Sequence, residues 1–184
     1  EDIAHSDGTV GGNDVEEAAA LGVALAEAGL DFLSISRGGK FDDCKQPAIG
    51  EAAYPYTGPS GHACIPRKKH DAPGLSVPLA ARIRAAVRAA GHTTPVVTAG
   101  KIFRPAQAEA VLAAEQADLI GMARALLADP DLPRKWRAGA DAAVTECVFC
   151  PYCEQADQRH ETVTCTLWPR IPGTKEHGIP PVWH

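Results

Sequence analysis

Short apolar segments alternate with amphipathic segments along most of the chain, and this alternation constrains the fold more than any other feature of the sequence. The apolar segments are LDFLSIS at 30–36, PVVTA at 95–99 and DLIG at 118–121. Apolar runs of this length are typical of strands that are buried on both faces. We therefore predict three buried strands.

Around these strands, apolar residues recur at helical spacing, which predicts helices at 13–29, 76–91, about 105–115 and from 124 to 129. Asn13 is the expected N-cap of the first helix, with Glu16 completing a capping box. The second helix is expected to turn three apolar residues to the core and three arginines to solvent, namely Leu79, Ile83 and Val87, and Arg82, Arg84 and Arg88. The third helix is expected to bury Val111 and Leu112.

This order of elements predicts an α/β fold with a parallel sheet covered by helices. Two architectures satisfy it, an open doubly wound sheet and a (β/α)8 barrel. A closed barrel typically takes about 250 residues. A chain of 184 residues with three predicted strands is too short for one.

The composition narrows the class of protein. Hydrophobic residues make up 45% of the chain and charged residues 22%, as in an ordinary soluble globular protein. The net charge of −5 argues against nucleic acid as a partner. The chain shows no signal peptide and no apolar run of membrane-spanning length, so we expect a reducing, cytoplasmic setting. Glu1 as first residue suggests a processed or truncated product.

Four cysteines near the C-terminus are spaced C-x2-C-x2-C-x11-C, at Cys147, Cys150, Cys153 and Cys165. Three thiols on one short segment, with a fourth returning later, can give one sulfur to each iron of a cubane cluster. A four-cysteine zinc site would use the same residues, and two disulfides are a weaker alternative. Pro151 and the polar residues 157–160 predict an irregular wrap here. The two remaining cysteines, Cys44 and Cys64, are expected to be ordinary thiols.

Two predicted strands end in residues suited to a phosphate. Gly100 and Lys101 follow the strand at 95–99, and Ala123 and Arg124 follow the strand at 118–121. Ligands of parallel α/β folds bind at the carboxyl ends of strands, and a helix N-terminus or an arginine can hold an anion there. Taken singly, Gly100 can simply turn the chain and Arg124 can solvate a helix end. Together on successive strands, the two pairs predict a phosphate site.

The segment 40–74, rich in Pro, Gly and Tyr, is long for a plain connector and suggests a functional loop. Tyr54, Tyr56 and His62 could line a pocket there, although packing of the loop is the favoured role of these side chains. Arg37, after the first strand, could contact a cofactor or an acidic substrate, and a surface ion pair is equally expected.

Four segments carry a resemblance to a known family. They are AGLDFLSISRGG at 28–39, TPVVTAGKI at 94–102, ADLIGMARALLADPDLPRKWRAG at 117–139 and CVFCPYCEQADQRHETVTC at 147–165. With them the chain resembles the C-terminal part of an NADH:flavin oxidoreductase of the Old Yellow Enzyme family. It is most similar to the iron–sulfur branch that includes 2,4-dienoyl-CoA reductase and trimethylamine dehydrogenase.

The resemblance implies that the three strands are the sixth to eighth of a flavin-binding barrel at 1–140, followed by an iron–sulfur segment at 141–184. Gly100, Lys101, Ala123 and Arg124 would bind the FMN phosphate, although the family usually has Gly-Arg at the last pair. The four cysteines would hold a [4Fe–4S] cluster. NAD(P)H would be the electron donor of the complete enzyme, which would reduce an activated alkene or oxidise an amine.

The family's first five strands, which carry the flavin-ring contacts and the active-site acid, do not match any part of this sequence. We therefore expect a piece of a flavoenzyme that associates with an N-terminal barrel half or with further copies of itself. A different hypothesis is a non-catalytic half-barrel that is stabilised by zinc or an iron–sulfur cluster and binds a partner protein. The catalytic residues are not identified by the sequence.

Overall fold

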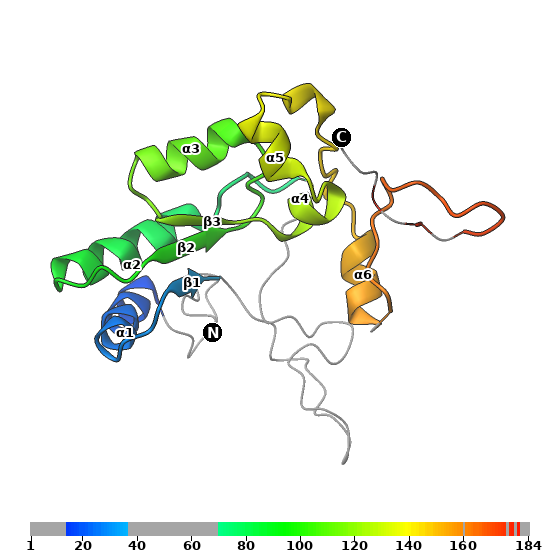
Figure 1. Ribbon diagram of the computed structural model, residues 1–184. Coiled ribbons are helices and arrows are strands. Elements are labelled where there is room, and N and C mark those ends of the chain that lie inside the picture. The colour runs from blue at the N-terminus through cyan, green and yellow to red at the C-terminus, as the bar shows by residue number, and fades with distance from the viewer. Residues whose placement is uncertain (1–13, 37–69, 160, 176, 179, 181–184) are drawn as a thin grey trace, which may run out of the picture.

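The structure is a computed structural model that describes residues 14–36, 70–159, 161–175, 177, 178 and 180. Helices and strands alternate as predicted through the first seven elements (Figure 1). These are α1 (Val15–Glu27), β1 (Leu33–Ile35), α2 (Val77–Ala89), β2 (Val96–Ala99), α3 (Pro105–Ala113), β3 (Leu119–Gly121) and α4 (Ala123–Ala128). Then follow α5 (Leu132–Arg137), the 3-10 turn η1 (Asp141–Ala143) and α6 (Tyr152–Gln158).

The three strands form one parallel sheet in the order β1-β2-β3. Leu33 is paired with Val96, and Val97 is paired with Leu119. Because all three strands are parallel, their carboxyl ends lie at the same edge of the sheet. The predicted parallel α/β arrangement is confirmed for the described residues.

The core lies between the sheet and helices α1 and α2, which pack side by side (Figure 1). Ile83 and Val87 of α2 are fully buried against Leu33 and Val96 of the sheet. Gly22 lets α1 approach α2 closely, because a Cβ at this position would lie 2.8 Å from Ile83 Cγ2. Burial of these aliphatic side chains is the main stabilising term for the unit.

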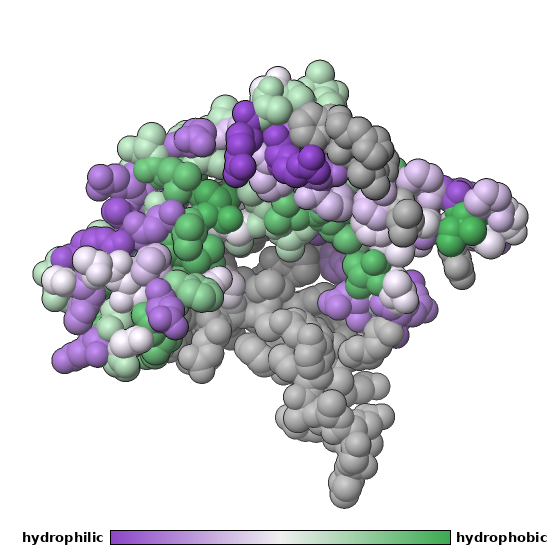
Figure 2. All heavy atoms as spheres, viewed as in Figure 1, coloured by the Kyte–Doolittle hydropathy of each residue, from purple (hydrophilic) through white to green (hydrophobic). Residues whose placement is uncertain are grey.

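A second, smaller cluster joins α3 to the sheet. It contains Val77, Ile102, Ala108, Val111 and Ala117. The space-filling view shows apolar side chains exposed over the region of β3, α2 and α3, with hydrophilic side chains around them (Figure 2).

The two faces of the sheet differ in burial. Leu33, Ile35 and Val96, on the helix side, are at most 3% exposed. On the opposite face, Ser34 is exposed and Leu119 is 51% exposed. A buried parallel sheet normally has both faces covered, so the described residues leave this second face partly uncovered.

Three local predictions were wrong. The cap of α1 lies one residue later than expected, at Asp14: its carboxylate accepts from the N–H groups of Glu16 and Glu17, and the Glu17 carboxylate accepts from the Asp14 N–H. Leu112 of α3 is 36% exposed. The expected irregular wrap after Pro151 is instead the helix α6, which begins directly after that proline.

Arg84 and Arg88 do not form a solvated face as predicted, because both bind the carboxylate of Asp118. Arg84 Nε lies 3.0 Å from Asp118 Oδ1, and Arg88 Nη2 lies 2.8 Å from Oδ2. The Val96 N–H also donates to Oδ2, at 2.8 Å. Burial opposes ionisation of this carboxyl, but the hydrogen bonds from Val96 and Arg84 and the two positive charges outweigh it and lower its pKa. Asp118 therefore ties the start of β3 to α2.

Within the described residues, no helix has the length and apolar character needed to cross a membrane. Several sequence predictions fall outside the described residues: those on Arg37, Cys44, Tyr54, Tyr56, His62 and Cys64. The proposed division at residue 140 stays a prediction.

Candidate functional site

The end of β2 makes a sharp turn at the first predicted phosphate pair. Gly100 has φ +114° and Lys101 has φ +57°, so two successive residues adopt left-handed backbone. The Lys101 ammonium donates a hydrogen bond to the Asp71 carbonyl. Lys101 Nζ also lies 5.1 Å from the centre of the Phe149 ring.

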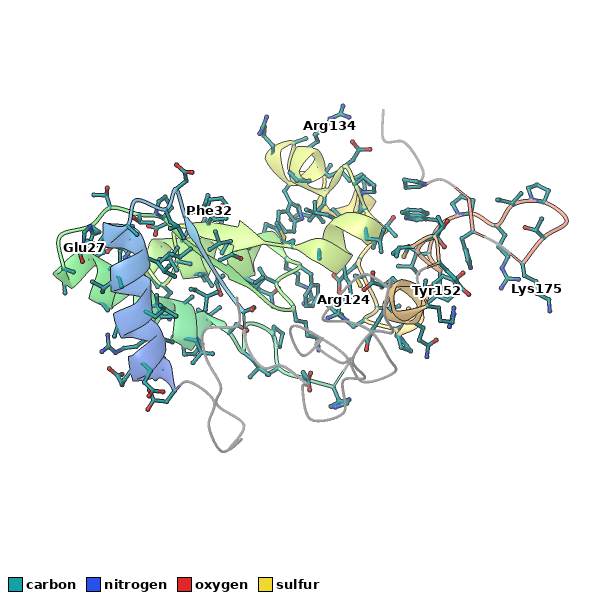
Figure 3. All side chains as sticks on the ribbon, turned by 90° about the horizontal axis from the view of Figure 1, so that it is seen from below. Glu27, Phe32, Arg124, Arg134, Tyr152 and Lys175 are labelled. Carbon is teal, nitrogen blue, oxygen red and sulfur yellow. The ribbon has the colours of Figure 1, made fainter. Side chains whose placement is uncertain are left out.

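The end of β3 leads almost directly into α4, whose first two residues are the second predicted pair, Ala123 and Arg124. The Arg124 guanidinium carbon lies 5.0 Å from the centre of the same Phe149 ring. In the view from below, Arg124 lies between the end of the sheet and the helix that carries Tyr152 (Figure 3). The structure thus brings the two strand ends and their cations to one place, as the parallel topology predicts.

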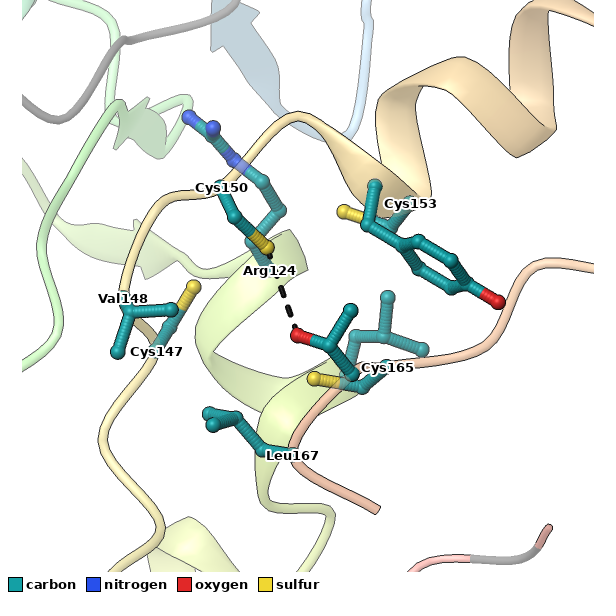
Figure 4. Close-up of a pocket in the computed structure, with 10 residues that line it drawn as sticks. Arg124, Cys147, Val148, Cys150, Cys153, Cys165 and Leu167 are labelled. Atoms are coloured by element: carbon teal, nitrogen blue, oxygen red, sulfur yellow. Dashed lines mark hydrogen bonds between the residues drawn. The ribbon is translucent and has the colours of Figure 1, made fainter. Parts of the chain in front are cut away.

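The four cysteines of the C-terminal motif line a single pocket, and Arg124 lines it with them (Figure 4). Cys147 and Cys150 lie in the loop before α6, Cys153 lies in its first turn, and Cys165 lies in the segment that returns afterwards. The thiols are half-buried or buried, and none is in a disulfide. Among the described residues, no three His, Cys, Asp or Glu side chains are close enough together to hold one metal ion. The sulfurs therefore surround the pocket without meeting at one point.

Two polar groups face the sulfurs directly. The Phe149 N–H donates to Cys147 Sγ at 3.4 Å. The Thr166 hydroxyl lies 3.6 Å from Cys150 Sγ, the contact drawn as a dashed line in Figure 4. Groups of this kind tune the electron density of ligating sulfurs.

Burial raises the pKa of the Cys147, Cys153 and Cys165 thiols. At each thiol a hydrogen bond from a backbone N–H opposes this rise in pKa. The Arg124 charge also opposes the rise at Cys147 and Cys153. The neighbouring thiols act in the same direction as burial. The pocket thus disfavours several thiolates side by side.

A buried ion pair fixes the start of the cysteine segment. Asp129 and Lys135 have side chains only 2% and 5% exposed, and Lys135 Nζ lies 2.6 Å from Asp129 Oδ2. The Thr145 N–H donates to that oxygen at 2.7 Å, two residues before Cys147. The turn after α4 and the helix α5 therefore set where the first cysteine lies.

Two further contacts hold the segment at its ends. Arg104, at the start of α3, makes a two-pronged ion pair with Glu146. Trp168, three residues after Cys165, donates from Nε1 to the Leu127 carbonyl of α4 at 3.0 Å. The motif is thereby attached to the start of α3 on one side and, on the other, to α4, which begins with Ala123 and Arg124.

Sequence reasoning missed three residues of this site. No role was assigned to Phe149, Asp129 or Lys135 from the sequence. The Phe149 ring contacts Lys101 and Arg124, which are 48 and 25 positions away in the sequence. Local sequence patterns do not predict contacts between residues so far apart. The one available signal was two apolar residues, Val148 and Phe149, between ligand-type cysteines.

Comparison with known proteins identifies the family. The model of the NADH:flavin oxidoreductase / NADH oxidase family matches residues 40–142, which is more than half of the chain. The chain belongs to this family. The resemblance drawn from the sequence is therefore confirmed.

Several curated relatives are oxidoreductases. The NADH oxidase of Thermoanaerobacter brockii is 31% identical over 140 residues, which are 76% of this chain and 18% of the relative. The metal reductase of Desulforamulus reducens is 41% identical over 96 residues, 52% of this chain and 14% of the relative. The bilirubin reductase of Mediterraneibacter gnavus is 36% identical over 74 residues, 40% of this chain and 12% of the relative. The chain thus spans less than a fifth of the length of each.

Solved structures share the fold. A complex of 2-naphthoyl-CoA reductase with 2-naphthoyl-CoA has a TM-score of 0.66 at 23% identity, covering 92% of this chain and 22% of that protein. Histamine dehydrogenase from Rhizobium sp. 4-9 has a TM-score of 0.64 at 24% identity, covering 88% of this chain and 20% of that protein.

Proposed function

We propose that this chain holds the FMN phosphate and a [4Fe–4S] cluster within an FMN-dependent oxidoreductase. One observation carries the proposal: Arg124 begins the helix after β3 and also lines the cysteine pocket. A single side chain thereby belongs to both the phosphate site and the cluster site. The two groups would lie close together, as electron transfer between them requires.

The phosphate of FMN would lie at the carboxyl ends of β2 and β3. Gly100 leaves room for the phosphate to approach the backbone, and Lys101 supplies a positive charge. Ala123 supplies a backbone N–H, and Arg124 can bind two phosphate oxygens at once. Bound FMN would supply hydride chemistry, taking electrons from NAD(P)H, and the complete enzyme would reduce an activated alkene or oxidise an amine.

The cysteine pocket has the donor set that a [4Fe–4S] cluster needs, four thiols with one for each iron. The Phe149 N–H and the Arg124 charge would offset the negative charge of the ligated sulfurs. These ligands need a reducing compartment, in agreement with the cytoplasmic location expected from the sequence. When bound, the cluster would carry single electrons.

We further propose that a complete enzyme includes barrel strands from beyond the aligned segment, in the same polypeptide or a partner. The chain spans 18% of the NADH oxidase it matches over the longest stretch. The sheet face that carries Leu119 is the one such strands would cover. The active-site acid and the substrate pocket would come from that portion.

Replacing Arg124 tests the phosphate assignment in the complete barrel. FMN affinity is measured alongside the affinity for riboflavin, which lacks the phosphate. Arg124→Gln should weaken FMN binding by about ten- to a hundredfold, because a charge-assisted hydrogen bond contributes roughly 1.5–3 kcal/mol. Riboflavin affinity should not change. Arg134→Gln, which removes an exposed arginine of α5, is the matched control. Equal FMN affinity in wild type and Arg124→Gln would exclude the assigned role.

A further inference from the structure

Phe149 occupies an unusual place in the cysteine loop. It lies between Cys147 and Cys150, is 9% exposed, and has φ +53°. Left-handed backbone is uncommon for any residue with a side chain and rare for a bulky one, whereas glycine adopts it at little cost. Such outliers concentrate at functional sites, where the surrounding structure maintains them. The position therefore suits glycine for its backbone but carries an aromatic ring.

Both cations of the predicted phosphate site lie close to this ring. Lys101 Nζ lies 5.1 Å from its centre and Arg124 Cζ lies 5.0 Å from it. Phe103 packs against it edge to face, with 5.0 Å between the ring centres and 67° between the planes. Among the described contacts, no other ring has two cations over it.

An aromatic ring is well suited to hold two cations that must remain available to an anion. Its face attracts positive charge through the ring quadrupole, at about 0.5–2 kcal/mol for each cation as a general magnitude. A carboxylate would attract them more strongly but would cancel their charge. Because the ring is neutral, its contact with Lys101 and Arg124 does not cancel their charge. Because it is rigid, it limits how far their long side chains move apart.

The backbone of the same residue reaches the cysteine side of the site. The Phe149 N–H donates to Cys147 Sγ at 3.4 Å. One residue thus contacts a cysteine sulfur through its backbone and both phosphate cations through its side chain. This joins the cysteine loop to the ends of β2 and β3.

We propose that Phe149 is a positioning residue that makes the cysteine loop part of the flavin phosphate site, by holding Lys101 and Arg124 toward one point. The inference rests on the proposed function, because it assumes that these cations bind the FMN phosphate. It adds a specificity determinant: the ring sets how strongly the site prefers a phosphorylated flavin over an unphosphorylated one.

Two variants of the complete barrel test the proposal, with FMN and riboflavin affinities measured for each. Phe149→Leu keeps an apolar side chain but removes the ring face. Phe149→Gly removes the ring and suits the left-handed backbone. Both should weaken FMN binding by about tenfold, the effect of losing roughly 1.4 kcal/mol of cation attraction. Riboflavin binding should stay the same in both. Phe32→Leu, the matched control, removes an exposed ring that directly precedes β1, at the sheet edge opposite the carboxyl ends, and should keep the preference for FMN.

The outcomes separate this inference from the proposed function. If the wild-type protein binds FMN and riboflavin equally well, the phosphate assignment itself is wrong. If the wild type prefers FMN and both Phe149 variants keep that preference, the phosphate site stands and the role of Phe149 is overturned. If the variants lose riboflavin as well as FMN, the ring supports the fold in general, and its specific role is likewise overturned.

Discussion

The buried pair of Asp129 and Lys135 offers a sharp test of how the cysteine segment is held. Asp129→Ala leaves the Lys135 ammonium, 5% exposed, without its partner at 2.6 Å. It also removes the acceptor of the Thr145 N–H at 2.7 Å. Removing one partner of a buried ion pair typically costs about 3–5 kcal/mol. That is a large part of the roughly 5–15 kcal/mol that stabilises an ordinary domain.

The assay is urea denaturation followed by circular dichroism. With an m-value of about 2 kcal/mol/M, a loss of about 4 kcal/mol lowers the midpoint by about 2 M. The double variant Asp129→Ala/Lys135→Met should recover part of the loss, because it removes the stranded charge and leaves an apolar side chain. Glu161→Gln, which breaks an exposed ion pair with Arg159, should leave the midpoint unchanged.

Either of two results would contradict a buried, paired charge at Lys135. One is a midpoint for Asp129→Ala within about 0.3 M of wild type, since a loss that small means the ammonium reaches water. The other is a double variant that is less stable than Asp129→Ala alone, because then Lys135 contributes packing and no stranded charge.

Three further outcomes follow from the structure. Because the pKa of Asp118 is lowered, this carboxylate adds stability that is present above the ordinary value of 3.8 and is lost as the pH falls below that value. Asp118→Asn should therefore flatten the dependence of the unfolding midpoint on acid pH. A pH profile equal to that of wild type would contradict this role of Asp118. Gly22→Ala should destabilise by about 1–3 kcal/mol in the same denaturation assay, because its Cβ would meet Ile83 Cγ2 at 2.8 Å; wild-type stability would show that the helices separate freely. Cys153→Ser should lose bound iron on elemental analysis whereas Cys44→Ser keeps it; equal iron in both removes Cys153 from the ligand set.

The order of helices and strands was predictable because each element has a local period. The strands are short apolar runs, and the helices repeat their apolar residues every three or four positions. The convergence of Lys101 and Arg124 was also predictable, since parallel strands end at one edge. These features depend on neighbouring residues and on topology alone.

The remaining features depend on contacts between distant residues. Arg84 and Arg88 looked solvated because their partner Asp118 is about thirty positions away. The helix α6 was missed because its sequence is polar and follows a proline, although proline is common just before or at the start of a helix. The ring of Phe149 meets Lys101 and Arg124 only in the folded chain. No local sequence pattern predicts this contact.

The proposed function places a cluster, held by four cysteines, next to a flavin whose phosphate is bound at two strand ends. Its most direct test is the content of iron, zinc and acid-labile sulfide in the complete barrel purified without oxygen. We expect about four irons and four sulfides for each chain and no stoichiometric zinc. One zinc for each chain, with no sulfide, would contradict the claim and assign the cysteines to a structural site.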